Sequence, residues 1–270
     1  MVAVAAGNRL EGVEAKVKRA KHHVRELNDV LQAFFAAHPY VIGTKRNPET
    51  RQLIYYLVSV REVPTMVDVI AGEVLQNLRS ALDHLAYQLV LVGTAQPGPF
   101  NHVYFPIFNS AKEYESGKLG QIKGMRQDAI DAIDAIKPYK GGNDTLWQLH
   151  RLNVVDKHRL LVTVGSSFQS LDIGPTLSRG LRALIPDEQK RAAMPDLSLF
   201  LRPQDNLFPL KAGDELFIDQ PDAEPDEHQQ IRFAVVINEP GVLEGEVIVE
   251  TLRQMVDLVD HVVLVFRPLL

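Results

Sequence analysis

Two long segments of the sequence repeat their apolar residues at the three-and-four spacing of a single helix face. The first covers residues 8–38 and stops at His38-Pro39, because the residue before a proline is pushed away from helical geometry. The second covers residues 64–92, and Pro64 is well placed as a helix start. A helix with one apolar face is stable when that face is buried, so this part of the chain is predicted to form a helical bundle.

Shorter patterns lie between and after these two helices. Residues 40–61 contain two extended runs rich in Tyr, Ile and Val around a turn, which predicts a β-hairpin. A short helix is predicted within residues 118–136, ended by Pro138. Asn143 or Asp144 is the expected N-cap of a further helix, TLWQLHRLNVVDKHRLL.

After about residue 160 the sequence pattern changes from long helical periodicities to short β-type runs. The short runs VTVGSSFQSL, LSLFLRP, DELFID and IRFAVVIN are separated by Gly, Pro and acidic residues, which predicts a compact sheet. The last segment, VIVETLRQMVDLVDHVVLVFRPLL, is dense enough in apolar residues to predict a buried C-terminal helix. The predicted class is α+β: a helical bundle over 1–160 with a hairpin near 40–61, then a β-rich portion over 161–270 closed by a helix. The alternative is that the two portions form one continuous domain.

Composition excludes several classes of function. The formal net charge of −5 gives no general attraction to polyanions, so contact with RNA would need a local basic patch. The absence of cysteine excludes disulfides, thiol nucleophiles and thiolate metal sites, and it fits a reducing, cytoplasmic environment. No segment is long and apolar enough to predict a membrane span, and the phosphate-loop, dinucleotide, zincin and esterase motifs are missing. We therefore predict no cofactor, no metal site and no membrane partner.

The segment NLRSALDHLAYQLV, residues 77–90, carries the first group of candidate functional residues. Arg79 and His84 are five positions apart on the predicted helix, which separates them by about 140° around its axis. Arg79 is better placed to pair with Asp83, at i+4. Asn77 and His84 are seven positions apart and share a face. The pair Arg79 and His84 is thus either a site or the polar edge of a core helix.

The segment HRLNVVDKHR, residues 150–159, carries the second group. Asp156, Lys157, His158 and Arg159 are four consecutive ionisable residues at a predicted helix end. In one interpretation His158 and Asp156 face His84 across a cleft while Lys157 or Arg159 holds an anion. In the other, three of the four side chains complement the negative end of the helix dipole and are solvated.

An Arg followed after four to six residues by a His, on a late helix of a bundle, resembles the signature of the HEPN superfamily. Active HEPN proteins are metal-independent ribonucleases that act as dimers. The resemblance implies that Arg79 stabilises charge on the scissile phosphate and that His84 is the general acid or base. Over residues 70–162, LRSALDHLAYQLV, the FPIF loop, KPY and LHRLNVVDKHRLL together resemble a family of uncharacterised bacterial, often actinobacterial, proteins.

Two hypotheses about function follow, and the sequence leaves open whether the protein is an enzyme. In the first, it is a HEPN-like protein that cleaves or binds RNA and forms a homodimer. Arg79 and His84 are then central, and the supporting or anion-binding residues are Asn77, Asp83, Asp156, Lys157, His158 and Arg159. In the second, it is a non-catalytic protein that binds a partner or ligand. Its Arg, His and Asp residues then form a buried structural network, with Asp156 pairing with His84 or Arg79.

Overall fold

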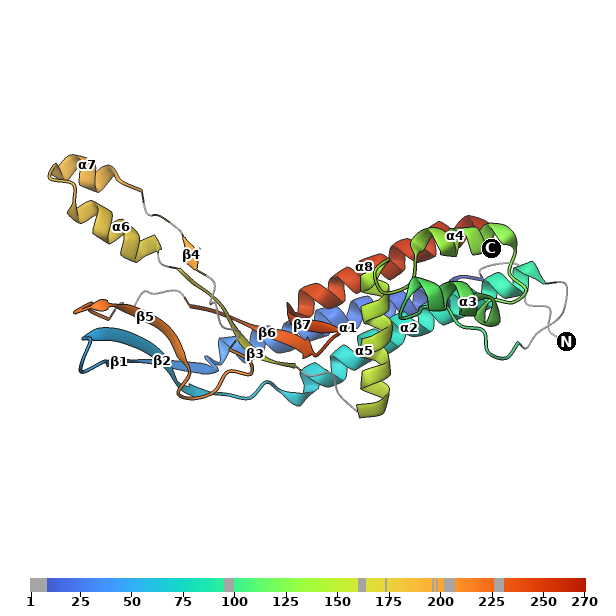
Figure 1. The fold of residues 1–270 in the computed structure, drawn as a ribbon, viewed down its shortest axis with the longest axis horizontal. Helices are drawn as coiled ribbons and strands as arrows, with labels where there is room; N and C mark the ends of the chain where they lie inside the picture. The colour runs from blue at the N-terminus through green and yellow to red at the C-terminus, as the bar shows by residue number, and fades with distance from the viewer. Residues whose placement is uncertain are drawn as a thin grey trace. The chain divides into compact units, whose positions relative to one another are not determined.

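The structure is a computed structural model that describes residues 9–94, 100–159, 164–172, 174–195, 197, 199–201, 207–225 and 231–270. It confirms the α+β class: a long N-terminal helix, two small antiparallel sheets and a C-terminal helix (Figure 1). The elements in chain order are α1 (Glu11–Ala36), β1 (Tyr40–Arg46), β2 (Gln52–Val60), α2 (Thr65–Gly93), α3 (Ala111–Gln121), α4 (Gln127–Ile136), α5 (Asp144–Arg159), β3 (Val164–Asp172), α6 (Gly174–Ala183), α7 (Glu188–Ala193), β4 (Phe200–Leu201), β5 (Glu215–Pro221), β6 (Ile231–Glu239), β7 (Leu243–Val247), α8 (Ile248–Phe266) and the 3₁₀ turn η1 (Arg267–Leu269).

The chain divides into two compact units, and each unit is assembled from separate stretches of sequence. The helical unit takes Met1–Gln32, Pro64–Thr163 and Ile237–Leu270. The sheet unit takes Ala33–Val63 and Val164–Val236. The hairpin β1–β2 therefore belongs to the same unit as β3 and β5, although the whole of α2 lies between them in the sequence.

The helical unit is built around α2. Its apolar stripe is fully buried, with Leu75, Leu78, Leu82 and Leu85 at 0% exposure. α8 and α5 pack against α2, and Figure 1 shows α5 crossing the long axes of α2 and α8 steeply. The periodicity that predicted α1, α2 and α8 is confirmed, because the apolar positions of each helix are the ones that the fold buries.

One predicted helix is corrected. We expected a single short helix within residues 118–136, but α3 ends at Gln121 and α4 begins only at Gln127. Gly124 lies between them with φ at +97°, a conformation that glycine adopts without steric cost and that interrupts a right-handed helix. α4 then ends as expected just before Pro138, with Lys137 in the left-handed region at φ +52°.

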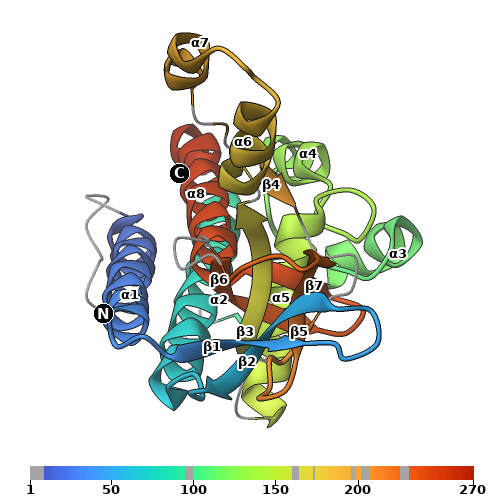
Figure 2. The ribbon, with the colours of Figure 1, turned by 90° about the vertical axis from the view of Figure 1, so that its left-hand side faces the viewer.

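The sheet unit contains the predicted hairpin and two helices, α6 and α7, that the sequence pattern did not indicate. β2 pairs with β1 on one side and with β5 on the other, both antiparallel (Figure 2). A second sheet has the order β4-β3-β6-β7, and of its strands β4, β3 and β6 up to Val236 belong to this unit. Helices α6 and α7 occupy a stretch that we read as loop, because Gly and Pro punctuate it. The core of this unit is formed by Leu57, Phe168, Leu171, Leu210 and Leu216.

Candidate functional site

Arg79 and Asp83 lie one turn apart on α2 and form an ion pair that also binds the main chain of Phe105. Arg79 Nη2 donates to Asp83 Oδ1 at 2.7 Å and to the Phe105 carbonyl oxygen at 3.0 Å. Arg79 Nε donates to Asp83 Oδ2 at 3.2 Å, and the Phe105 amide donates to Asp83 Oδ1 at 2.9 Å. The expected i,i+4 pairing is confirmed, and it attaches the segment around Phe105 to α2.

Burial controls the electrostatics of this pair. The Arg79 side chain is only 8% exposed and that of Asp83 24%. Burial lowers the pKa of Arg79 from its ordinary value, and the Asp83 carboxylate opposes that change. Burial likewise raises the pKa of Asp83, against the effects of Arg79 and the Phe105 amide. Each group is the counter-ion of the other, so removing either would leave a buried charge without its partner.

His84 lies on a different surface of the helical unit. Its side chain is exposed and lines a groove of about 540 Å³ with Arg9, Glu11, Tyr87 and Gln88, at the start of α1. Arg79 is not among the residues that line this groove, because it faces the Phe105 segment. The structure therefore does not bring Arg79 and His84 together, which agrees with their angular separation on the helix.

The six supporting residues do not gather around His84 either. Asn77 donates through Nδ2 to the Glu73 carbonyl oxygen of its own helix at 2.8 Å. The carboxylate of Asp156 packs against Gly72 of α2, and burial raises its pKa. Lys157 is exposed, and its charge opposes the burial that raises the pKa of Asp83. The side chains of His158 and Arg159 lie outside the described residues. Among the described residues, the ion-pair partner of Arg79 is Asp83 and not Asp156.

His150 on α5 belongs to the Arg79 cluster, although the sequence pattern did not single it out. Its Nδ1 atom and the Nη1 atom of Arg79 are buried and have no hydrogen-bond partner in the described part of the chain. Burial lowers the pKa of His150 to about 4, and the positive charges of Arg79, Arg151 and Lys157 act in the same direction. His150 is therefore neutral at physiological pH. The main cause of the lowered pKa is burial, which no local sequence pattern indicated.

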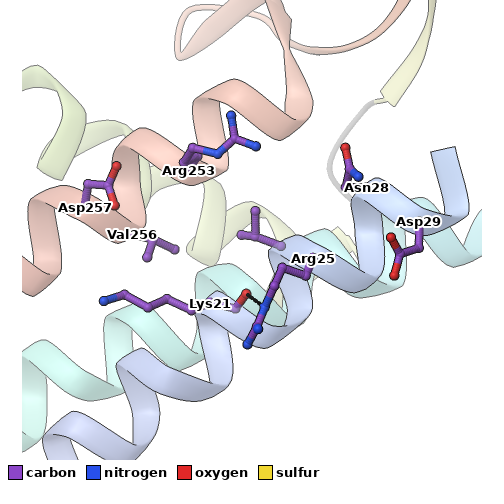
Figure 3. Close-up of a pocket in the computed structure, with 8 residues that line it drawn as sticks. Lys21, Arg25, Asn28, Asp29, Arg253, Val256 and Asp257 are labelled. Atoms are coloured by element: carbon purple, nitrogen blue, oxygen red, sulfur yellow. Dashed lines mark hydrogen bonds between the residues drawn. The ribbon is translucent and has the colours of Figure 1, made fainter. Parts of the chain in front are cut away.

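A second candidate site is the groove between α1 and α8 in the helical unit (Figure 3). It has a volume of about 690 Å³, within the roughly 300–1,000 Å³ of small-molecule sites. Figure 3 shows Arg253 and Asp257 of α8 on one side of the groove and Lys21, Asn28 and Asp29 of α1 on the other. Its full lining is Lys21, Val24, Arg25, Asn28, Asp29, Arg253, Val256 and Asp257.

Ion pairs hold α1 against the C-terminal part of the chain beyond this groove. Lys21 Nζ lies 2.6 Å from Asp260 Oδ2, and Arg267 Nη2 lies 2.7 Å from Glu14 Oε1. Lys21 comes seven residues after Glu14, whereas its partner Asp260 comes seven residues before Arg267. The two segments therefore run antiparallel, and α1 and α8 are neighbours. The next step in the series would pair Asn28 with Arg253, and both of these residues line the groove.

Two searches of the described residues bear on other kinds of site. No group of three or more His, Asp or Glu side chains in the described part of the chain is arranged to hold a metal ion. None of the helices described is long and apolar enough to cross a membrane. Comparisons of the chain with protein-family models, with curated proteins and with solved structures find no match.

Proposed function

We propose that the chain is a non-catalytic ligand-binding protein in which the Arg79–Asp83 pair is structural and the groove between α1 and α8 is the binding site. One observation carries this proposal: the guanidinium of Arg79 is buried against Asp83 and the Phe105 main chain. A group that stabilises a reacting phosphate must reach it directly, and the exposed surface at Arg79 is too small for this contact.

The position of His84 supports the same proposal. A general acid or base must lie within hydrogen-bond reach of the atom that Arg79 would stabilise. His84 instead lines the groove formed with Arg9 and Tyr87, which does not include Arg79. The α1–α8 groove, by contrast, combines an apolar floor with charged groups of both signs, as binding sites for small polar molecules do.

RNA binding is a second candidate, favoured by the exposed basic residues in the middle of α1. Lys18, Arg19, His22 and Arg25 are all exposed on that helix, and such a patch could contact phosphates despite the net negative charge. RNA as a partner, a homodimer and a cytoplasmic location stay predictions. The first of them is tested together with cleavage.

The test is incubation of the purified protein with single-stranded and structured RNA in EDTA, beside His84→Ala and the matched variant Gln88→Ala. Gln88 lines the same groove one turn after His84. We expect no cleavage that depends on His84, and equal melting temperatures for the two variants. RNA anisotropy on the same samples measures binding. Cleavage that disappears only in His84→Ala, at an unchanged melting temperature, would overturn the proposal and establish the nuclease.

A further inference from the structure

The inference concerns the Asn28 and Arg253 positions in the groove and rests on the proposed function. At the two preceding positions in the series, a cation on one helix meets a carboxylate on the other, in the pairs Glu14–Arg267 and Lys21–Asp260. At the third, Arg253 of α8 has the uncharged Asn28 at the corresponding position of α1. At this third position α1 therefore has no carboxylate to pair with Arg253.

Within the described residues, the carboxylate partner of Arg253 lies on its own helix. Its Nη1 atom lies 3.0 Å from Glu250 Oε2, and both side chains are more than half exposed, at 53% and 55%. An exposed pair at i,i+3 stabilises a helix by only a few tenths of a kcal/mol, so it holds the guanidinium weakly. Arg253 is therefore able to bind a ligand carboxylate through two N–H groups on one edge of its guanidinium, and the Asn28 amide can donate to the same group.

The rest of the groove determines what else such a ligand must carry. Asp257 lies one turn after Arg253, toward Lys21, whereas Asp29 lies at the opposite end of the groove (Figure 3). A ligand that extends from Arg253 toward Lys21 therefore meets the carboxylate of Asp257. Neither aspartate forms an ion pair within the described residues. Val24 and Val256 also line the groove, and Figure 3 shows Val256 beside Asp257. The complementary molecule has a carboxylate, a short aliphatic body and an ammonium group.

We propose that the α1–α8 groove binds a small aliphatic zwitterion, with the ligand carboxylate on Arg253 and Asn28 and the ligand ammonium on Asp257. Val24 and Val256 would contact the aliphatic body. A small molecule is favoured over a protein partner because the groove is of ligand size, whereas a stable protein interface buries about 800 Å² on each side.

Ligand-observed NMR with three probes of equal chain length tests the proposal: 5-aminopentanoate, pentanoate and pentylammonium. The zwitterion should bind the full chain at least about tenfold more tightly than either singly charged probe, because it gains a charge-assisted contact at each end. Equal affinities for the three probes, or no binding of 5-aminopentanoate, would overturn the proposal.

Variants assign each end of the ligand. Arg253→Gln should weaken 5-aminopentanoate and pentanoate about tenfold and leave pentylammonium unchanged. Asp257→Asn should weaken 5-aminopentanoate and pentylammonium and leave pentanoate unchanged. Asn28→Asp supplies the missing carboxylate within the protein, so it should raise the melting temperature slightly and abolish pentanoate binding. Glu14→Gln breaks the most distant ion pair and is the control, with affinities unchanged.

The outcomes separate this inference from the proposed function. A neutral compound that binds wild type and is blocked by Asn28→Trp would keep the groove as a ligand site and reject the zwitterion. Cleavage of RNA that depends on His84 would reject the proposed function. Retention of 5-aminopentanoate binding in both Arg253→Gln and Asn28→Asp would show that the ligand carboxylate lies elsewhere.

Discussion

A guanidinium held below a protein surface keeps its charge only where acceptors surround it, and Arg79 has these in Asp83 and the Phe105 carbonyl. The local part of this arrangement was predictable, because Asp83 follows Arg79 at i+4 on a helix. The contact with Phe105 was not, because nothing local in the sequence brings a residue from a Pro/Gly-rich loop onto this turn of α2. His150 was missed for the same reason: its neighbours in space come from two helices.

Replacing Arg79 by Met should lower the free energy of unfolding by about 3–5 kcal/mol, because Asp83 stays buried without its counter-ion. The double variant Arg79→Met/Asp83→Leu should recover part of this loss, but not all, since the Phe105 amide and carbonyl lose their partners. Urea unfolding measures both values. His84→Ala is the matched control on the same helix and should change stability by less than about 0.5 kcal/mol. A comparably small effect of Arg79→Met would contradict a structural role.

His150 predicts a pH dependence of stability. Its folded-state pKa of about 4 lies below the ordinary value of 6.5, so between these two values the unfolded chain binds more protons than the folded one. The contribution of His150 is fully present above about pH 6.5 and is lost as the pH falls toward 4. The loss in this range should amount to about 2–3 kcal/mol.

The comparison that isolates His150 is the difference between wild type and His150→Gln in urea unfolding from pH 4 to 7. Asp68→Asn is the control of opposite sign. Burial raises the pKa of Asp68 to about 6, so its contribution to stability is lost as the pH rises from about 4 through 6. If the wild-type and His150→Gln profiles run parallel, His150 is not buried in its neutral form.

At the scale of elements, local periodicity predicted where most helices lie but not how they contact one another. α1, α2, α8 and the β1–β2 hairpin follow from spacing, proline positions and turn residues, and the structure confirms them. α6 was missed because Gly174, Pro175 and Gly180 are typical of loops. The relation between α1 and α8, in which positions 14, 21 and 28 face 267, 260 and 253, needs the antiparallel register of two helices more than two hundred residues apart. The groove between them was therefore beyond the reach of the sequence.

The contact between α2 and α5 gives an element-scale prediction at Gly72. A Cβ added there would lie 2.5 Å from Asp156 Oδ1, so Gly72→Ala forces the two helices or the carboxylate to shift. We expect a loss of about 1–3 kcal/mol, although Gly→Ala within a helix ordinarily stabilises by about 1 kcal/mol. Thermal unfolding of the variant measures the change.

Two further variants complete this test. Gly72→Ala/Asp156→Ala should regain most of the stability, because the side chain that meets the new methyl group is gone. Gly12→Ala, on α1, is the control in open space: its Cβ would have no neighbour within 4 Å, and it should not destabilise. A stable Gly72→Ala single variant would mean that Asp156 does not pack tightly against α2.

At the scale of the whole molecule, the two units are each assembled from distant parts of the chain. The sequence pattern indicated a change from helices to strands near residue 160. It gave no indication that the hairpin near 40–61 would pair with a strand from the last third of the chain. β2 and β5 meet through residues such as Ile54 and Ile218. Strand pairing over such a separation depends on the sum of many contacts, and no local signal encodes it.

This assembly imposes an order on folding during synthesis, because a ribosome releases the chain from the N-terminus at about 5–20 residues per second. The last stretch of the sheet unit ends at Val236, so its strands are all available before α8 emerges. α2 is synthesised much earlier, and part of its apolar surface stays uncovered until α8, Ile248–Phe266, has emerged. In that interval α2 can pack only against segments already made, such as α5, so the part of its surface that α8 covers stays exposed and chaperone binding would be needed most.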